Sequence, residues 1–520
     1  MKPGRTIIHV TTEVAPFYKR GGMGDVVGAL PRYLENEHTH NIIICPFYDG
    51  KMEHLEDADI VLGHNRMQYR GIPYDFSFYY LRQGSIEYYF IKLSDSIILS
   101  ERENNDGCLP YSVRVSIVPH FYFAKAVLHL IDRQHLSPDY LICHDWHTGG
   151  CFGFTGLLAQ IKKNKSFRSL FMIHNYEFQG DIYEDIYDYI DSDVAFQLNE
   201  IFSRYGCASL MALALTNSDY IATVSHSYAV ELAAGKIPHT GLKYLDLCSR
   251  QVLSFLNGID PTLWRPETSP FLPWSYSLET LEQKLELKKR VLTHYDFQEP
   301  THTRPPLVLM LCRLTVQKGI ELFTGNQEEG SCLSSFKNMA YLLEQGCRFI
   351  ICGNPGGGLK GVIDTGLSRL QKEFPGRFLY LNHYNEPEAH LLLAAADILL
   401  APSLFEPCGL VQVYAMAFGT VPVVHPVGGM RDTVCCHFEN PGIATGFYMN
   451  HFSRECLQET LKKAIHLYYH EPITWRGIMT RGMKADFSWE RMKSQYFRFF
   501  EAIEKGNSVD HAALTRIIKG

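Results

Sequence analysis

The sequence predicts an α/β protein that contains two large domains, each built on a doubly wound parallel sheet. The first observation is the length of 520 residues, which exceeds a single hydrophobic core and indicates about two to four domains. The second is that short apolar runs of strand length alternate with longer segments of helical periodicity in both halves of the chain. The third is that several of these runs end in polar residues, which is typical of parallel strands that meet a ligand at one edge of a sheet.

The composition excludes several classes of protein. Hydrophobic residues make up 46% of the chain and charged residues 20%, which is typical of a globular protein and excludes large-scale disorder. The net charge of −7 argues against nucleic acid or an anionic membrane as a general partner. The 14 cysteines are scattered without a CxxC pair, which favours reduced thiols in a cytoplasmic protein. No apolar stretch approaches the roughly 18 residues of a spanning helix, so we expect a soluble chain without a signal peptide.

The first predicted strand, residues 6–10, is followed by a loop that carries Glu13, Lys19 and the pair Gly21-Gly22, and then by a helix. A strand, a glycine turn and a helix start form a layout that binds anions at the edge of a doubly wound sheet. The loop matches neither GxGxxG nor GxxxxGK[ST], so a dinucleotide site and a P-loop are weak interpretations. Taken alone, the glycine pair is an ordinary turn and Lys19 is a solvated lysine.

Two further predicted strands, residues 140–143 and 170–173, also end in polar clusters. The residues that follow them are His144, Asp145, Trp146 and His147 after the first strand, and His174 and Asn175 after the second. Together with Glu13, these clusters bring polar groups from three strands to one sheet edge, which favours a binding site. His144 and His147 have a spacing that suits metal ligands, but without an evident third ligand we interpret them as hydrogen-bonded core histidines.

The other elements of the first half are a strand at residues 41–48, an antiparallel pair within residues 76–93 and a strand end at residues 222–225. The sequence Asn257-Gly258-Ile259-Asp260 predicts a turn, and a segment rich in Pro and Ser follows at residues 266–276. We therefore place the boundary between the domains near residue 250.

The second half begins with a strand predicted at residues 307–311, after which Arg313 and Lys318 lie on a loop and a helix start. A lone Arg or Lys on a loop is usually solvated. At the carboxyl edge of a sheet, however, this pair suits a diphosphate, because Arg binds two oxygens in a fork and Lys acts as a mobile point charge.

The strand predicted at residues 398–401 ends in a loop that carries Glu406, Cys408 and Gly409. Residues 410–418 then predict a buried helix, whose first N–H groups and dipole are able to hold a phosphate beside the carboxylate. A further strand, at residues 421–425, runs into a glycine turn. Taken alone, this segment is an ordinary crossover with one solvated glutamate.

The whole stretch is more specific than its parts. SLFEPCGL, YAMAFGTVPVV and GGMRDTV, within residues 403–434, resemble the signature of bacterial glycogen synthases and plant starch synthases. These are retaining glucosyltransferases with the two-domain GT-B fold. Further matches are EVAPFYKRGGMGDVVGALPRYL, HDWH, IHNYEFQG, NGID and RLTVQKG, so the resemblance extends to about residue 505.

The resemblance implies the GT-B fold, in which two Rossmann-like domains with doubly wound parallel sheets face each other across a cleft. It implies an N-terminal domain on the acceptor side at residues 1–250 and a domain that binds the nucleotide sugar at residues 251–485. Residues 486–520 hold a C-terminal helix that in relatives crosses back to the N-terminal domain.

The resemblance also implies the site residues. The residues with catalytic roles are Lys19, His174, Arg313, Lys318 and Glu406. The residues that bind substrate or nucleotide are Glu13, Gly21, Gly22, Asp145, Asn175, Asn257, Tyr384, Cys408, Gly409, Leu410 and Thr433, with Tyr384 stacked on the adenine. No metal ligand and no cofactor are implied.

Two positions depart from the family pattern. Arg20 stands where a Thr is common, which adds a charge near the expected diphosphate. The Asp-Arg-Pro element that relatives carry is missing between residues 94 and 116. Because of these two departures, the contribution of the two loops to substrate binding stays open. The choice of nucleotide stays open with it.

The sequence thus predicts a cytoplasmic enzyme that transfers glucose from ADP-glucose to the 4-hydroxyl at the non-reducing end of an α-1,4-glucan. We expect no metal, no nucleic acid and no membrane as partners, and a homo-oligomer stays open. One alternative is a retaining glycosyltransferase that uses UDP-glucose or another acceptor. A second is a catalytically silent glucan-binding or initiation partner, which would be expected to have lost Lys19, Arg313, Lys318 or Glu406.

Overall fold

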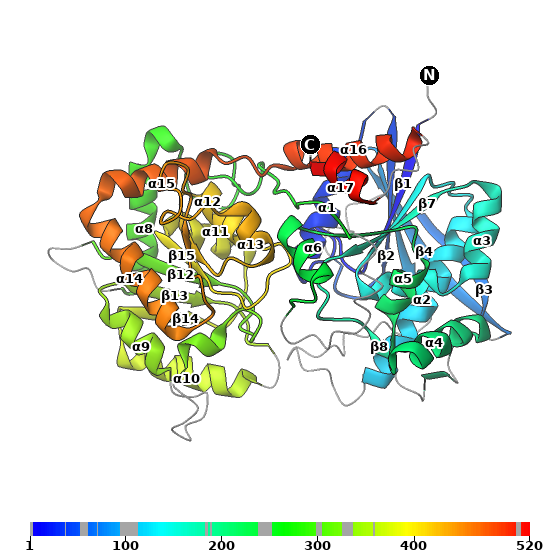
Figure 1. Cartoon of the computed structure of the whole chain (residues 1–520), viewed down its shortest axis with the longest axis horizontal. Coiled ribbons are helices and arrows are strands. Elements are labelled where there is room, and N and C mark those ends of the chain that lie inside the picture. Colours follow the sequence, from blue (N-terminus) through cyan, green and yellow to red (C-terminus); the bar gives the residue numbers. More distant parts are fainter. Residues whose placement is uncertain are drawn as a thin grey trace. The chain divides into compact units, whose positions relative to one another are not determined.

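The computed structural model of the chain forms two compact units, which are described separately (Figure 1). Among the described residues, the first unit contains the chain up to Gly258 and from Trp489 onward, and the second unit contains Ile259–Ser488. The structure describes residues 4–36, 38–52, 61–69, 71–93, 113–182, 186–187, 190–237, 252–297, 304–324, 336–356, 359–505 and 511–519.

The first unit is built on a sheet with the strand order β11-β10-β7-β6-β1-β2-β5-β4-β3. Its pairs are parallel except β3 with β4 and β4 with β5, so the antiparallel pair predicted within residues 76–93 is confirmed. A separate antiparallel pair joins β8 (Asp181–Ile182) to β9 (Ala208–Ser209). The strands of the main sheet are β1 (Arg5–Val10), β2 (Thr39–Pro46), β3 (Val61–Tyr69), β4 (Ile72–Gln83), β5 (Ile86–Lys92), β6 (Tyr140–His144), β7 (Arg168–Ile173), β10 (Tyr220–Thr223) and β11 (Leu253–Ser254).

The central strands β1, β6 and β7 are nearly continuous apolar runs with buried side chains, as in parallel sheets covered by helices on both faces. The C-terminal segment packs on this unit, since the rings of Tyr140 and Phe500 are in contact and Arg5 pairs with Glu504 at 2.7 Å. The helices of the unit are α1 (Gly22–Leu34), α2 (Val113–Arg133), the 3-10 helix η2 (Trp146–Phe152), α3 (Thr155–Asn164), α4 (Ser192–Tyr205), α5 (Leu210–Asn217), α6 (His226–Ala233), α16 (Trp489–Glu504) and α17 (His511–Lys519).

The second unit has a fully parallel sheet with the strand order β14-β13-β12-β15-β16-β17. These strands are β12 (Leu307–Leu311), β13 (Arg348–Cys352), β14 (Phe378–Leu381), β15 (Ile398–Ala401), β16 (Val421–Val424) and β17 (Phe447–Tyr448). The helices are η4 (Leu278–Thr280), α8 (Glu282–His294), η5 (Ile320–Phe323), α9 (Lys337–Glu344), α10 (Lys360–Glu373), α11 (Glu386–Ala395), α12 (Val411–Ala417), α13 (Gly428–Thr433), α14 (Arg454–His470) and α15 (Pro472–Lys484).

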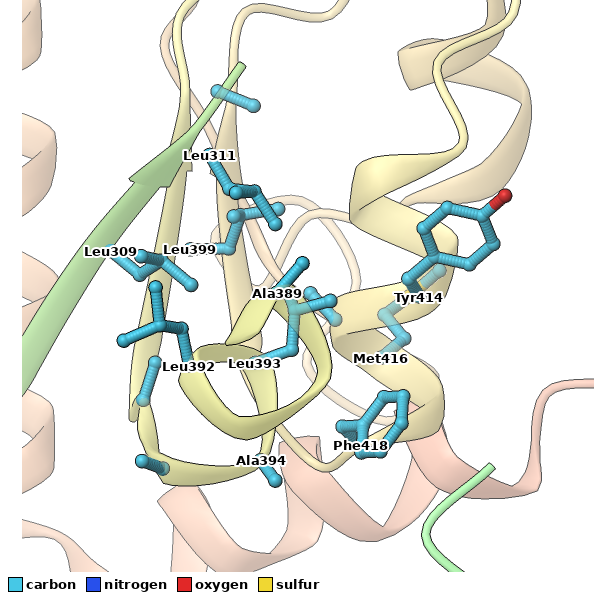
Figure 2. Close-up of a cluster of buried hydrophobic side chains, with 14 of the residues drawn as sticks. Leu309, Leu311, Ala389, Leu392, Leu393, Ala394, Leu399, Tyr414, Met416 and Phe418 are labelled. Carbon is cyan, nitrogen blue, oxygen red and sulfur yellow. The ribbon is translucent and has the colours of Figure 1, made fainter. Parts of the chain in front are cut away.

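Successive residues of β12 belong to two different cores, which makes this unit doubly wound. Leu309 and Leu311 pack with α8, α11 and α12 on one face, whereas Val308 and Met310 pack with α9, α10 and α14 on the other. Figure 2 shows the first core, in which side chains of α11 and α12 lie beside Leu309, Leu311 and Leu399 of the sheet. Because both faces are covered, polar side chains reach solvent at the ends of the strands.

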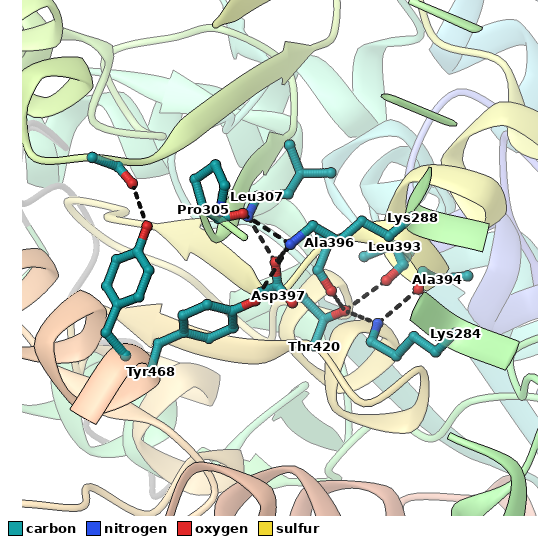
Figure 3. A network of polar contacts seen from close by, with 12 residues as sticks. Lys284, Lys288, Pro305, Leu307, Leu393, Ala394, Ala396, Asp397, Thr420 and Tyr468 are labelled. Atoms are coloured by element: carbon teal, nitrogen blue, oxygen red, sulfur yellow. Dashed lines mark hydrogen bonds and ion pairs between the residues drawn. The ribbon is translucent and has the colours of Figure 1, made fainter. Parts of the chain in front are cut away.

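A buried polar network lies at the amino-terminal side of this sheet (Figure 3). Lys288 Nζ pairs with Asp397 Oδ2 at 2.6 Å, and the same carboxylate accepts a hydrogen bond from the backbone N–H of Leu307. Lys284 Nζ donates to the carbonyl of Ala394 at 2.7 Å and to Thr420 Oγ1 at 3.1 Å. The hydroxyl of Thr420 in turn shares its proton between the carbonyls of Leu393 and Ala396. The side chains of Lys284 and Thr420 thus satisfy the free carbonyls at the end of α11.

We predict that Lys284→Met changes how the stability of the fold depends on pH. Burial lowers the pKa of Lys284 from 10.5 to about 7, so between these values the unfolded wild type binds more protons than the folded protein. Its free energy of unfolding therefore rises with pH by up to about 1.4 kcal/mol per pH unit, and the variant lacks this rise. Urea unfolding at about pH 7 and about pH 9, followed by circular dichroism, measures the difference.

The matched control is Lys289→Met, because Lys289 lies on the same helix with a side chain that is 51% exposed. We expect this control to follow the wild type at both pH values. A difference between wild type and Lys284→Met that stays constant with pH would contradict the prediction.

Candidate functional site

In the parallel part of each sheet the strand order reverses at one point, and both points coincide with predicted site residues. In the second unit the reversal lies between β12 and β15, which are hydrogen-bonded neighbours. In the first unit it lies between β1 and β6. Ligands of open α/β sheets bind outside the carboxyl ends of the strands at such a switch point.

At the switch point of the second unit, Lys318 forms an ion pair with Glu406. Ser403 Oγ donates to the same carboxylate oxygen, Glu406 Oε2, at 2.9 Å. The Glu406 side chain is only 7% exposed, so it is desolvated and held by these two partners. The structure therefore brings together the predicted cation after β12 and the predicted carboxylate after β15.

The backbone of Glu406 is held by close approaches that only glycine permits. Gly428 has a φ of +44°, and a Cβ there would lie 1.9 Å from the carbonyl oxygen of Glu406. Gly319 has a φ of +78°, and its Cβ would lie 2.3 Å from the carbonyl oxygen of Pro402. The N–H of Gly429 donates to the Glu406 carbonyl at 3.0 Å, so the glycine turn after β16 fixes the loop after β15.

A further loop follows Glu406 and contains Cys408, Gly409 and Leu410. Gln412 Nε2 donates to the carbonyls of Cys408 at 3.2 Å and Gly409 at 2.6 Å, and to Thr433 Oγ1 at 3.0 Å. Helix α12 begins at Val411, with Leu410 as its N-cap, one residue later than predicted and without a side-chain cap. The structure thus joins Cys408, Gly409 and Thr433 through Gln412.

Sequence reasoning missed Gln412 and Ser403. The sequence held a signal for Gln412, because it is a polar residue in an otherwise apolar predicted helix. In the structure its side chain is fully buried, and a buried amide needs hydrogen-bond partners. Arg313 is exposed at the carboxyl end of β12, and Tyr384 is 49% exposed beyond β14. In the sheet order, β13 and β12 separate the strand before Tyr384 from the strand before Glu406.

In the first unit, Glu13 binds the glycine loop itself. Glu13 Oε2 accepts hydrogen bonds from the backbone N–H of Arg20 at 2.6 Å and of Gly21 at 2.8 Å. Lys19 Nζ pairs with Asp25 Oδ1 at 2.6 Å, and Arg20 is exposed. Helix α1 begins at Gly22, so the predicted helix follows the glycine loop directly. The amides of Arg20 and Gly21 are therefore already occupied by a carboxylate of the same loop.

Asp145 joins the ends of β6 and β7. Its Oδ1 accepts hydrogen bonds from the backbone N–H of His174 at 2.7 Å and of Asn175 at 3.1 Å. Burial raises the pKa of Asp145 to about 7, although the two backbone hydrogen bonds oppose this shift. The predicted cluster of Asp145, His174 and Asn175 is thus one hydrogen-bonded group. Asn257, at the end of this unit, is buried, and its Oδ1 has no hydrogen-bond partner among the described residues.

The predicted histidines at the ends of β6 and β7 are hydrogen-bonded or packed against other rings. His144 Nδ1 contacts His174 Nε2 at 2.9 Å, and His144 Nε2 contacts His9 Nδ1 at 3.2 Å. His147 packs against Trp146 and His120. Over the described ranges, the structure contains no group of three or more His, Cys, Asp or Glu side chains that could hold a metal ion. Sequence reasoning missed His9, whose place in an apolar strand gave the only signal.

Comparisons with known proteins agree with this arrangement. Residues 6–245 match the family model of the starch synthase catalytic domain, and residues 293–472 match that of glycosyl transferases group 1. The glycogen synthase of Geobacillus stearothermophilus is 32% identical over 514 residues, which cover 96% of this chain and 98% of the relative. That of Streptococcus agalactiae serotype III is 32% identical over 511 residues, which cover 96% of this chain and all of the relative.

The chain belongs to the glycogen synthase family of glycosyltransferases.

A solved structure of the same family extends the comparison. The catalytic domain of starch synthase IV from Arabidopsis thaliana, bound to ADP and acarbose, matches with a TM-score of 0.82 and 26% identity over 99% of this chain and 100% of the other. Sucrose-phosphate synthase from Thermosynechococcus elongatus has the same fold, with a TM-score of 0.58, 15% identity and coverage of 97% of this chain and 100% of the other. The predicted family, enzyme class and GT-B fold are therefore confirmed.

The structure also bears on two other expectations from the sequence, the absence of a membrane-spanning helix and the divergent loop at residues 94–116. No helix in the described part of this glycogen synthase family member is long and apolar enough to cross a membrane. The departure from the family pattern between residues 94 and 116 falls largely outside the described residues, because the description resumes at residue 113.

We predict that Gly428→Ala lowers turnover by about 100-fold. A Cβ at this position displaces the backbone of Glu406, which the sequence predicts to be catalytic, and a shift of about 1 Å at a catalytic group has an effect of this size. Steady-state kinetics of the purified variant measure the loss, and circular dichroism establishes that the variant is folded. The matched control is Gly442→Ala, since a Cβ at Gly442 meets nothing within 4 Å. Equal turnover in the two variants would contradict the prediction.

Proposed function

We propose that this protein transfers glucose from ADP-glucose to the 4-hydroxyl at the non-reducing end of an α-1,4-glucan, with retention of configuration. The observation that carries the proposal is the pair of Lys318 and Glu406 at the switch point of the second unit. The relatives named glycogen synthase, and the starch synthase IV domain bound to ADP and acarbose, support this choice of donor and acceptor.

The order of groups along the sheet of the second unit supports a nucleotide sugar as ligand. Tyr384 follows β14, Arg313 and Lys318 follow β12, and Glu406 follows β15. Adjacent strands are about 4.8 Å apart, so three strand steps span roughly 14 Å. An aromatic ring, two cations and a carboxylate in this order suit a base, a diphosphate and a sugar.

Departure of the diphosphate is the step that these cations assist. Negative charge grows on the leaving oxygen, and a prepositioned cation or hydrogen-bond donor of this kind contributes about 100- to 1,000-fold in rate. Arg313 supplies a planar fork and Lys318 a point charge, and the N–H groups at the start of α12 supply further donors. We therefore propose that the reaction proceeds without a metal ion.

Glu406 stabilises positive charge that develops at the anomeric carbon of the glucose. Among the described residues its polar partners are Lys318 and Ser403, and no second carboxylate is paired with it. A double displacement through a glycosyl-enzyme intermediate would need two carboxyl groups that flank the bond to the leaving group. One of them would act as the nucleophile and the other as the acid. We therefore propose that the acceptor attacks from the face that the diphosphate leaves.

The first unit contributes groups that hold sugar hydroxyls. The cluster of Asp145, His174 and Asn175 is rigid, because the carboxylate binds two backbone N–H groups. We propose that His174 and Asn175 hold the glucose, that Lys19 assists the diphosphate and that Asn257 binds substrate. The described cysteines are free thiols, which supports a cytoplasmic location.

We predict that Lys318→Ala and Arg313→Ala each lower kcat by at least about 100-fold, because each removes a cation from the leaving diphosphate. Release of ADP in the presence of glycogen measures the loss. The control is Arg369→Ala, because Arg369 lies on α10 of the same unit and pairs with Glu373 at the surface. Near-normal turnover in both site variants would refute the mechanism.

We also predict that the purified protein releases ADP from ADP-glucose only when glycogen is present and that EDTA leaves the rate unchanged. The assay compares ADP-glucose with UDP-glucose and omits the acceptor as a control. Faster release from UDP-glucose would support the mechanism but show that the donor is UDP-glucose. No release from either donor, together with binding of glycogen, would contradict the enzymatic function and indicate a catalytically silent glucan-binding partner.

A further inference from the structure

The loop that carries Glu406 is held by the segments that follow both neighbours of β15 in the sheet, which are β12 and β16. After β12, the carbonyl of Gln317 accepts a hydrogen bond from the backbone N–H of Leu404 at 2.8 Å. After β16, His425 Nδ1 lies 2.8 Å from the carbonyl oxygen of Ser403. His425 directly follows the last residue of β16 and is partly buried. On the β16 side a side chain therefore holds the loop.

The position of the proton on the His425 ring follows from the geometry. A backbone carbonyl only accepts hydrogen bonds, so Nδ1 must be protonated and donate to Ser403. Both the charged ring and the neutral ring with its proton on Nδ1 meet this condition. Burial lowers the pKa of His425 below its ordinary value of 6.5, so the neutral ring predominates at physiological pH and its Nε2 is unprotonated.

Ser403 links His425 to Glu406. It is 2% exposed, and its Oγ donates to Glu406 Oε2 at 2.9 Å. The hydroxyl of a serine is separated from the backbone by one rotatable bond, so its direction follows from the backbone once that bond is in one staggered position. The hydrogen bond from His425 to the Ser403 carbonyl therefore helps to fix the direction of the hydroxyl that holds the carboxylate.

The two oxygens of the Glu406 carboxylate have different surroundings. Lys318 Nζ and Ser403 Oγ both contact Oε2, whereas Oε1 has no hydrogen-bond partner among the described residues. Lys318 carries a point charge on a flexible stem, so its ammonium group can follow the carboxylate. The short hydroxyl of Ser403 cannot follow it, so this hydroxyl decides which oxygen is held. Oε1 is therefore the oxygen that remains for a ligand to bind.

We propose that His425 is a positioning residue, which holds the carbonyl of Ser403 so that the Ser403 hydroxyl binds Glu406 Oε2 and leaves Oε1 for the substrate. The role of Glu406 in turnover, and with it the effect of His425 on kcat, rests on the proposed function. The hydrogen-bonded order of His425, Ser403 and Glu406 does not rest on it. His425 thus acts through Ser403 and needs no contact with the substrate.

A pair of substitutions at position 425 separates the hydrogen bond from the rest of the ring. Asn and Leu branch alike at Cγ, and the amide nitrogen of Asn lies as many bonds from the backbone as Nδ1 of His. His425→Asn therefore keeps a donor for the Ser403 carbonyl, whereas His425→Leu removes it. A difference between these two variants reports the hydrogen bond itself.

The first test follows Glu406 without substrate, by NMR of the full chain with carbon-13 at the side-chain carboxyl of its glutamates. The Glu406 resonance is assigned by comparison with Glu406→Gln. We expect Ser403→Ala and His425→Leu each to shift this resonance, and His425→Asn to leave it near its wild-type position. An unshifted resonance in folded His425→Leu, or equal shifts in the two variants at position 425, would overturn the proposal. Because this measurement needs no turnover, its result is separate from the success or failure of the proposed function.

The second test uses the wild type, so it decides the proposal even where a variant does not fold. It is a nitrogen-15 spectrum of the full chain with ring-labelled histidine, in which His425 is assigned by the signal that His425→Asn lacks. We expect a protonated Nδ1 and an unprotonated Nε2. A ring with its proton on Nε2 alone would overturn the proposal, because it has no donor for the Ser403 carbonyl.

The third test measures turnover. We expect His425→Leu to lower kcat by about tenfold, the size of one neutral hydrogen bond, with little change in KM for the nucleotide sugar, and His425→Asn to recover most of the loss. The matched control is Tyr276→Phe, which we expect to keep the wild-type kcat. Tyr276 also donates a hydrogen bond of 2.8 Å to a carbonyl, that of Phe418, the C-cap residue of α12. An unchanged kcat in His425→Leu, a loss in KM alone, or a loss that His425→Asn does not recover would overturn the proposal.

The last test shows whether His425 acts through Ser403. Ser403→Ala removes the hydroxyl that links the ring to Glu406 and keeps the backbone carbonyl. In this background we therefore expect His425→Leu to lower kcat by much less than in the wild type, because the two residues belong to one hydrogen-bonded series. An equal fold loss in both backgrounds would show that His425 acts by another route and would overturn the proposal.

Discussion

Burial of the parallel strands on both faces is the constraint from which the polar sites of this protein follow. Alternate residues of β12 enter different cores, so a charged group along the strand would meet apolar side chains on either side. Charged groups therefore lie at the ends of the strands, with Asp397 before β15 and Glu406 in the loop that follows it. Where the strand order reverses, the loops after the two neighbouring strands turn away from each other and leave room for a ligand. In the second unit Lys318 lies in the loop after β12 and Glu406 in the loop after β15.

A desolvated carboxylate needs partners, and this requirement determines the loops around Glu406. Its side chain is 7% exposed, and the ion pair with Lys318 and the hydrogen bond from Ser403 offset the cost of desolvation. The backbone is fixed separately, since Gly428 approaches the carbonyl oxygen of Glu406 too closely for any other residue and the N–H of Gly429 donates to that oxygen. The fold itself thus holds this carboxylate in one position, which is the condition under which electrostatic stabilisation costs no reorganisation.

The sequence allowed the family, the α/β class, most strand positions and the coincidence of polar groups at strand ends to be predicted. Periodicity reports which residues are buried and where a strand ends, so it placed Glu406 and Asp145 after strands. Their expected roles came from the resemblance to the family. Periodicity does not report side-chain partners between distant segments. The contacts of Gln412 with Cys408 and Thr433, and of His9 with His144, join positions that are up to 135 residues apart, so they required the structure.

The switch point of the second unit and the buried cluster around Asp145 in the first unit differ in electrostatic state. In the second unit a full ion pair is kept at the switch point, which suits a ligand with formal charges on its phosphates. In the first unit burial lowers the pKa values of His9, His144 and His174 and raises that of Asp145 to about 7, so the imidazoles are neutral and the carboxylate carries only part of its charge. Neutral donors and acceptors in a buried site discriminate among uncharged polar ligands by geometry, because a wrong partner leaves a buried group unpaired. The ion pair therefore suits a charged ligand, whereas the neutral cluster suits an uncharged one.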